Sequence, residues 1–148
     1  MSADAIDLPK QSAMRGVIPY LSLRGKATAA ADFYLGAFDA TDLGRMPMPD
    51  HPDQVMHLQL EINGGALMMT DHAGDSAGAA TAPLVNGHLQ LVVGDGKAWF
   101  DRAVAAGCRE LAPFEMQPWG DYWGLLLDPF GIHWAILQPG PGRTSTTE

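Results

Sequence analysis

The chain has 148 residues, 47% hydrophobic and 8% aromatic, which is enough to build one buried core and excludes bulk disorder. Its formal net charge of -8 argues against nucleic-acid binding, because only nine lysine and arginine residues are spread through the sequence. Cys108 is the sole cysteine, so no intrachain disulfide can form. We find no signal-peptide pattern and no apolar stretch of bilayer length, and we expect an acidic, cytoplasmic enzyme or binding protein.

The first half of the chain predicts a strand, a helix and two further strands. Residues 1–15 sustain no hydrophobic period and predict a flexible leader. Residues 16–23 predict a strand whose proline suits an edge or a strand end, and the alanine-rich residues 26–38 predict a helix. Residues 39–46 predict the next strand, and a proline-rich loop leads from it to a clearly alternating strand at Val55–Ile62.

The strand Val55–Ile62 predicts one apolar and one polar face. Its even positions, Met56 to Ile62, are apolar, whereas His57, Gln59 and Glu61 point the other way. An Asn-Gly-Gly turn then leads into an apolar strand that ends at Thr70, which is the pattern of a hairpin. Residues 72–86 are rich in Gly, Ala, Ser and Thr and predict a linker.

The second half repeats this order. Residues 87–93 alternate as a strand, with His88 and Gln90 on one face, and Gly96–Ala106 predicts a helix that Gly107 terminates. Residues 108–116 predict the next strand. Two apolar strands within residues 119–137 follow, joined by an Asp-Pro-Phe-Gly turn, and the polar residues 139–148 predict a flexible tail.

The chain therefore predicts an α+β fold in which a βαβββ module occurs twice, at residues 16–71 and 87–138, within one structural domain. Sliding one hairpin sequence onto the other places Ile62 on Asp128, Gly65 on Gly131, Met69 on Ala135 and His57 on Trp123. The polar side chains that each copy carries on its strands are the candidates for function.

These residues resemble a known superfamily when both copies are considered together. The resemblance rests on the following motifs: Pro19-Tyr20-Leu21-Ser22-Leu23, Phe33-Tyr34, Arg45-Met46-Pro47-Met48, Val55-Met56-His57, Gly64-Gly65, Trp119-Gly120-Asp121 and Asp128-Pro129-Phe130-Gly131. The chain is similar to the vicinal oxygen chelate superfamily, which includes glyoxalase I, extradiol dioxygenases and bleomycin-resistance proteins, and most of all to its PhnB-like branch.

The resemblance implies that curved mixed sheets from the two copies form a cup, commonly completed by a second subunit, so we expect a homodimer. It also implies that metal-dependent members take ligands from the first and last strand of each copy. The matching positions here are Pro19, Met69, His88 and Ala135, of which only His88 coordinates metals well. We therefore expect no metal and no cofactor.

The predicted cup is lined by strand parity with residues that suit a small, apolar or carbonyl-bearing molecule. The candidate catalytic residues are His57 and His88, which would act as acid–base groups. The candidate ligand-binding residues are Gln59, Met69, Gln90, Trp119 and Trp123. Two alternatives stay open: a protein that only sequesters its ligand, as in antibiotic resistance, and a metal-dependent lyase, isomerase or dioxygenase.

Other polar and aromatic residues have structural interpretations. Trp134 is expected to pack under a helix, and His51, His72 and His133 are expected on the surface or in packing. The acidic residues are expected to form a solvated face, with Asp71 in a turn. A rearranged metal site that uses His57, Glu61 and His88 is possible from the ligand types alone.

Overall fold

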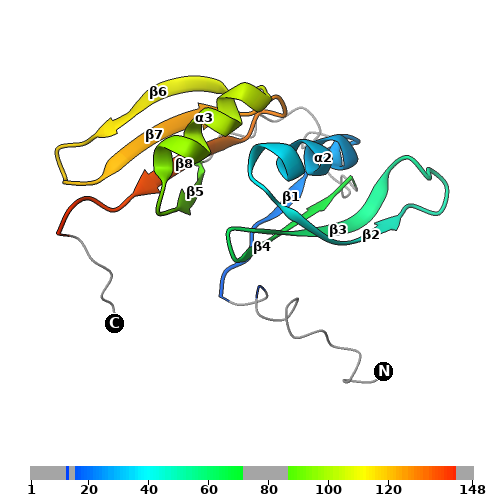
Figure 1. Cartoon of the computed structure of the whole chain (residues 1–148). Coiled ribbons are helices and arrows are strands. Elements are labelled where there is room, and N and C mark those ends of the chain that lie inside the picture. The colour runs from blue at the N-terminus through cyan, green and yellow to red at the C-terminus, as the bar shows by residue number, and fades with distance from the viewer. Residues whose placement is uncertain (1–12, 14–15, 72–86, 143–148) are drawn as a thin grey trace. The chain divides into compact units, whose positions relative to one another are not determined.

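The computed structural model describes residue 13, residues 16–71 and residues 87–142 (Figure 1). Its chain divides into two compact units, Met1–Ala82 and Pro83–Glu148. Each unit contains one βαβββ module, so the predicted α+β class and the repeat are confirmed. Most of the predicted leader, the whole linker at 72–86 and the end of the tail lie outside the described residues. No helix in the described ranges is long and apolar enough to cross a bilayer.

The first module consists of one helix and a four-stranded mixed sheet. Its elements are β1 (Tyr20–Ser22), α2 (Ala27–Ala37), β2 (Thr41–Pro47), β3 (Val55–Ile62) and β4 (Gly65–Thr70). The strand order is β1-β4-β3-β2, with β1 parallel to β4 and the other pairs antiparallel. Leu58, Leu60 and Ile62 are buried on the side of the sheet that faces α2, as the alternation predicted.

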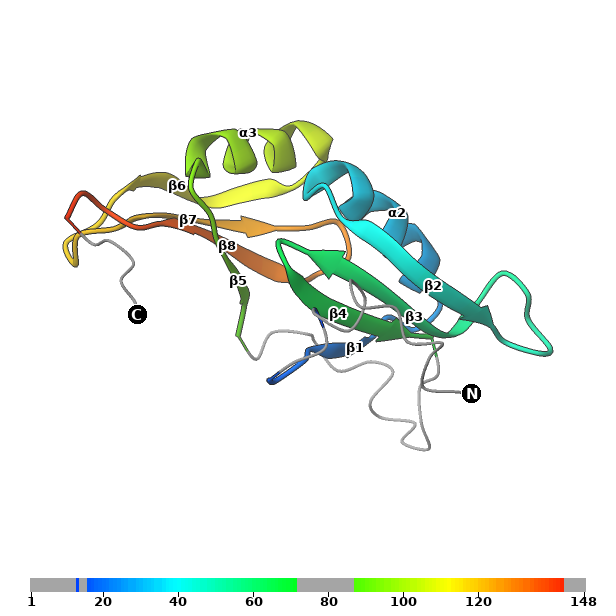
Figure 2. The same ribbon diagram turned by 60° about the horizontal axis from the view of Figure 1, so that its bottom comes forward.

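The second module has the same order. Its elements are β5 (Leu89–Val92), α3 (Gly96–Ala106), β6 (Arg109–Met116), β7 (Tyr122–Leu127) and β8 (His133–Gln138), arranged as β5-β8-β7-β6. Figure 2 shows α3 lying along one face of its own sheet. Trp134 is 2% exposed on this face and donates its indole N–H to Asp128 at 2.9 Å, so the prediction that it packs under a helix is confirmed.

Each helix begins where a side chain accepts its unpaired backbone N–H groups. Asp95 caps α3 by accepting from the Ala98 amide at 3.2 Å, and Gly107, with φ of 130°, ends the helix in the left-handed region that glycine tolerates. In the first module, Asp71 accepts from the amides of Gly25 and Ala27 at 2.8 and 2.9 Å. This carboxylate therefore fixes the start of α2 from the far end of β4.

The expectation that the acidic residues form a solvated face is wrong for three of them. Asp71, Asp121 and Asp128 are only 6%, 3% and 3% exposed. Each accepts hydrogen bonds from backbone amides, which compensates for the loss of water. Asp71 is therefore a buried anchor between β3, β4 and α2, whereas the sequence suggested a simple turn.

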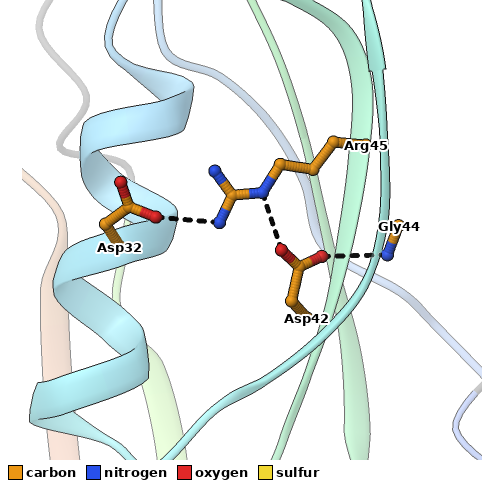
Figure 3. Close-up of polar contacts among 4 residues, drawn as sticks. All are labelled: Asp32, Asp42, Gly44 and Arg45. Carbon is orange, nitrogen blue, oxygen red and sulfur yellow. Dashed lines mark hydrogen bonds and ion pairs between the residues drawn. The ribbon is translucent and has the colours of Figure 1, made fainter.

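A β-bulge gives β2 its ion-pair network. The pairing of β2 with β3 shifts between Asp42 and Gly44, and Asp42 accepts from the Gly44 amide at 2.9 Å (Figure 3). Arg45 bridges Asp42 at 2.8 Å and Asp32 of α2 at 2.9 Å. Partial burial opposes the charge of Arg45, but hydrogen bonds to Asp32 and Asp42 outweigh it and raise the pKa of the guanidinium. The network ties α2 to β2.

Candidate functional site

Each sheet has an open face, which we define as the face turned away from the helix of its own module. Direct partners in a ladder place their side chains on the same face. Tyr20 pairs with Met68, Met68 with Gln59, and Met46 with His57. Tyr20, Met46, His57, Gln59 and Met68 therefore share the open face of the first sheet, where none of them is fully buried.

The central contact of this open face joins Tyr20 and His57. The phenolic oxygen of Tyr20 lies 2.8 Å from Nδ1 of His57, and the two ring centroids are 5.6 Å apart. The bond reaches across β4, over the position of Met68, because Tyr20 is on β1 and His57 is on β3. Tyr20 is 53% exposed, so a ligand can reach the pair from solvent.

This hydrogen bond couples the tautomer of His57 to the direction of the Tyr20 hydroxyl group. When the Tyr20 hydroxyl donates to Nδ1, a neutral imidazole carries its hydrogen on Nε2 and donates from that atom. Among the described residues, Tyr20 is the sole hydrogen-bond partner of the His57 ring. His57 thus has the chemistry to recognise a carbonyl oxygen or to exchange a proton with it.

The open face of the second sheet carries a related contact. The Trp123 indole N–H donates to Oε1 of Gln90 at 3.3 Å. The indole crosses β8 to reach β5, above Ala135, which pairs with Gln90 and is completely buried.

Two more aromatic rings extend this contact into a row. The His88 and Trp123 centroids are 6.2 Å apart at 69°, and the Trp119 and Trp123 centroids are 6.1 Å apart at 70°. His88 precedes β5 and is exposed, so it is not a strand residue as predicted. We call His88, Trp119 and Trp123 the aromatic row. It contains three of the predicted site residues, of which Trp123 contacts Gln90.

The two polar contacts occupy equivalent positions of the repeat. The Leu23 amide donates to Thr70 at 2.8 Å and the Val93 amide donates to Leu137 at 2.9 Å, which aligns the last strands of the two modules. Met68 lies two residues before Thr70, and Ala135 lies two residues before Leu137. They pair with Tyr20 and Gln90 on one side and with Gln59 and Leu125 on the other. The contact between Tyr20 and His57 in the first module therefore occupies the same place as the contact between Gln90 and Trp123 in the second module.

The placement predicted for Met69 is wrong. Met69 pairs with Leu58, is fully buried and lies on the helix-facing side, so Met68 takes its place on the open face. The physical reason is the turn length. Six residues separate the paired Leu60 and Leu67, whereas seven separate Leu126 and Trp134, so the two hairpins are offset by one residue.

Sequence reasoning missed Tyr20 as a site residue. His57, Gln59, Gln90 and Trp123 lie on the open faces as predicted, but Tyr20 was noted only as part of a family motif. The alternation of the three-residue β1 is too short to reveal its parity. Its pairing with Met68, which lies 48 residues further along the chain, shows that Tyr20 is on the open face.

The resemblance assigned metal ligands to Pro19, Met69, His88 and Ala135, which offer a single imidazole. The residues that the structure places on the open faces of the first and last strands do not fit a catalytic divalent ion either. On the open faces, the first and last strands present Tyr20 with Met68 and Gln90 with Ala135. A phenol, a thioether, an amide and a methyl group are a poor donor set. Within the described ranges, no three His, Cys, Asp or Glu side chains gather closely enough to hold an ion.

The rearranged metal site is not supported either. Glu61 is four residues from His57 on the same strand, which is roughly 13 Å at the rise of a β-strand. One ion spans only about 4 Å between the donor atoms of its ligands.

Two βαβββ modules, each with polar and aromatic side chains on the open face of its sheet, define the fold class of this chain. A family model described as "Glyoxalase/Bleomycin resistance protein/Dioxygenase superfamily" matches residues 19–136, which covers both modules. The chain belongs to this superfamily. The resemblance inferred from the sequence motifs is thereby confirmed at the level of the family.

Relatives of known sequence are similar over most of the chain. The uncharacterised protein Mb0911c of Mycobacterium bovis is 41% identical over 118 residues, which is 76% of this chain and 76% of that protein. Protein YjdN of Escherichia coli is 30% identical over 136 residues, which is 80% of this chain and 91% of that protein.

A solved structure shares the fold at lower identity. It is described as a putative 3-demethylubiquinone-9 3-methyltransferase, PhnB protein, from Bacillus cereus, and it matches with a TM-score of 0.67 at 19% identity, covering 84% of this chain and 99% of that chain. A PhnB protein therefore stands among the structural neighbours. The predicted cup concerns the placement of the two modules relative to one another and stays a prediction.

Proposed function

We propose that this protein binds a small, largely apolar organic molecule with a carbonyl or similar acceptor group, and that it does so without a metal ion. The single observation that supports this most is the 2.8 Å contact of Tyr20 with His57 on the open face of the first sheet. It holds a protic side chain in a defined orientation among partly exposed neighbours.

The surroundings of His57 suit such a ligand. Met46, its partner on β2, is 56% exposed, and Met68 lies on the next strand. The flexible thioether side chains of these methionines can pack against apolar groups of different shapes. Gln59 adds an amide that can donate and accept hydrogen bonds. A few polar groups among apolar ones are typical of small-molecule sites.

The proposal has two readings that differ in chemistry. In the first, His57 only orients the ligand, as in a sequestering protein. In the second, it also donates or accepts a proton at a carbonyl-bearing substrate, which needs a histidine within hydrogen-bond reach of the reacting atom. His88 is the corresponding candidate in the second module. The binding step is common to both readings.

The proposal is tested by comparing His57→Gln with His51→Gln. His51 is exposed in the loop before β3 and serves as the matched control. A library of small carbonyl-bearing aromatic compounds is screened by NMR, and the hits are titrated into each variant. His57→Gln should weaken binding about 3- to 10-fold, the worth of one hydrogen bond, with His51→Gln unchanged. Equal affinities for the two variants would contradict the proposal.

Metal independence is tested separately. Dialysis of the wild-type protein against a chelator should leave the affinity for the same hits unchanged. Retention of a stoichiometric Mn, Fe, Ni or Zn ion, with loss of binding on its removal, would favour a metal-dependent lyase, isomerase or dioxygenase instead. Homodimer formation and a cytoplasmic location stay predictions.

A further inference from the structure

The aromatic row of the second module presents two tryptophan rings at an angle. Trp119 and Trp123 meet at 70°, so neither ring lies flat over the other, as it would in a stacked pair. Trp119 is 54% exposed, and the centroid of the His88 ring lies 6.2 Å from that of Trp123 at an angle of 69°. The two indoles therefore form a corner whose walls are aromatic ring faces.

The position of Trp119 is fixed by its loop. Gln117 donates its side-chain N–H to the carbonyl oxygens of Glu115 and Trp123, at 3.1 and 3.3 Å. Its backbone accepts from the Gly120 amide at 2.9 Å, and Gly120 has a φ of 100° that only glycine adopts without strain. The indole of Trp119 is therefore attached to a tight turn that is anchored to both strands.

A carboxylate adjoins this corner. Glu115 is the direct partner of Trp123 in the β6–β7 pair, so both side chains point from the open face, and Glu115 is exposed. Arg109, the one lysine or arginine in the four strands of this sheet, pairs with Leu127 at the other end of β6. The charge beside the aromatic rings is therefore negative.

We infer that the aromatic row and Glu115 form a binding subsite for an organic ammonium group, recognised through cation–π contacts and the carboxylate. A cation within about 6 Å of an indole centroid is attracted by the ring quadrupole, and a nearby carboxylate adds to that attraction. The net charge of -8 favours the approach of cations in general. The inference goes beyond the proposed function, because it adds a recognition site for a charged group on the second module, apart from the Tyr20 and His57 contact of the first module.

The test uses choline and its neutral isostere 3,3-dimethylbutan-1-ol, which differ in charge and hardly in shape. Both are titrated into the full chain while the indole N–H signals are followed by NMR. Two tryptophans serve as internal controls: Trp134 is buried with its N–H on Asp128, and Trp99 already has the Arg102 guanidinium 4.6 Å from its ring. The signals of Trp119 and Trp123 should shift on saturation with choline, while those of Trp99 and Trp134 stay in place.

Choline should bind at least 3-fold more tightly than the isostere. Glu115→Gln should reduce that preference without removing it, because the indoles remain, and Trp119→Leu should weaken choline binding about 2- to 5-fold, the range expected for one exposed cation–π contact. Both positions are exposed, so the variants should fold. Equal binding of the two probes, or unchanged choline affinity in both variants, would overturn the inference.

Two further outcomes separate this inference from the proposed function. If the isostere shifts Trp119 and Trp123 as strongly as choline does, the site recognises organic molecules without a charge preference, and only the inference fails. If choline binds while no carbonyl-bearing compound is affected by His57→Gln, the proposed function fails and the cation subsite stands. A concentration-dependent shift of Trp119 without any probe would show that a second copy covers the row, which would also overturn the inference.

Discussion

Asp71 and Gln138 occupy the same position in the two modules, and each accepts a hydrogen bond from the backbone at the start of its own helix. Asp71 follows Thr70 and Gln138 follows Leu137, the two residues that accept from the end of the first strand. Asp71 binds the amides of Gly25 and Ala27, and Gln138 binds the Gly96 amide at 2.8 Å. In both modules, the residue at this position, at the end of the last strand, therefore ties the start of the helix to the sheet by hydrogen bonds, although the side chains differ.

Replacing Asp71 should destabilise the first module strongly. Asp71→Ala leaves the amides of Gly25, Ala27 and Val55 without their acceptor in a buried site, so we expect a loss of about 3 kcal/mol in the free energy of unfolding. Gln138→Ala, which frees one amide, should cost about 1 kcal/mol. Urea denaturation measures both, with the exposed Asp50→Ala as the control. A loss at Asp71 no greater than at Asp50 would contradict the assignment.

A methyl group added at Gly124 should destabilise the second module. An ideal Cβ there would lie 2.7 Å from Cε1 of Phe100 and 2.8 Å from the backbone Cα of Phe114. Gly124→Ala should therefore cost about 1–3 kcal/mol through overpacking. The control is Gly36→Ala in α2, where no atom lies within 4 Å and alanine favours the helix. Thermal unfolding should separate the two variants in opposite directions, and equal shifts would refute the predicted crowding.

The thiol of Cys108 should stay unreactive in the folded protein. Burial, and to a lesser extent the charge of Asp128, raise the pKa of Cys108 from 9.0 to about 12. The thiolate is the nucleophile, so a thiol reagent at pH 8 should label the protein only after denaturation. Rapid labelling of the native protein would contradict this.

The same shift predicts how stability depends on pH. Because the folded state keeps the Cys108 proton between pH 9 and about pH 12 while the unfolded state loses it, this group stabilises the fold fully below pH 9. Its contribution should fall by about 1.4 kcal/mol per pH unit above that point. Comparison with Cys108→Ala isolates this slope from other alkaline titrations. Parallel pH profiles for the two proteins would be inconsistent with the raised pKa.

The ion pairs of Arg45 should contribute modestly and depend on salt. Arg45→Met removes contacts to Asp32 and Asp42 at a partly exposed position, so we expect a loss of about 0.5–1 kcal/mol that shrinks at high ionic strength. The pair of Lys97 and Asp101, whose side chains are 78% and 60% exposed, is a control whose removal should matter less. A salt-independent loss would indicate packing of the arginine stem as the cause.

Local features of the sequence predicted the fold well. The strand Val55–Ile62 and the helix Gly96–Ala106 have the predicted limits, because alternation, the Asp95 cap and the Gly107 stop act within a few residues. The repeat order also follows from such local patterns. The prediction succeeded wherever the determining contacts are close in the chain.

The site was predicted less completely, because its geometry depends on distant pairings. The one-residue difference between the hairpins moves Met69 from the open face to the core, and only the register of β4 reveals it. The role of Asp71 depends on amides that are 44 and 46 residues away. Tyr20 meets His57 across 37 residues. No local pattern carries this information.

The most direct test of the central claim is the ring ¹⁵N spectrum of His57, recorded with and without a carbonyl-bearing hit from the compound screen. We expect Nδ1 to accept from Tyr20, the hydrogen to reside on Nε2, and the ligand to shift the Nε2 signal. Tyr20→Phe should weaken both effects without unfolding the chain. A hydrogen fixed on Nδ1, or a ligand that leaves the His57 ring signals unchanged while it binds elsewhere, would contradict the claim.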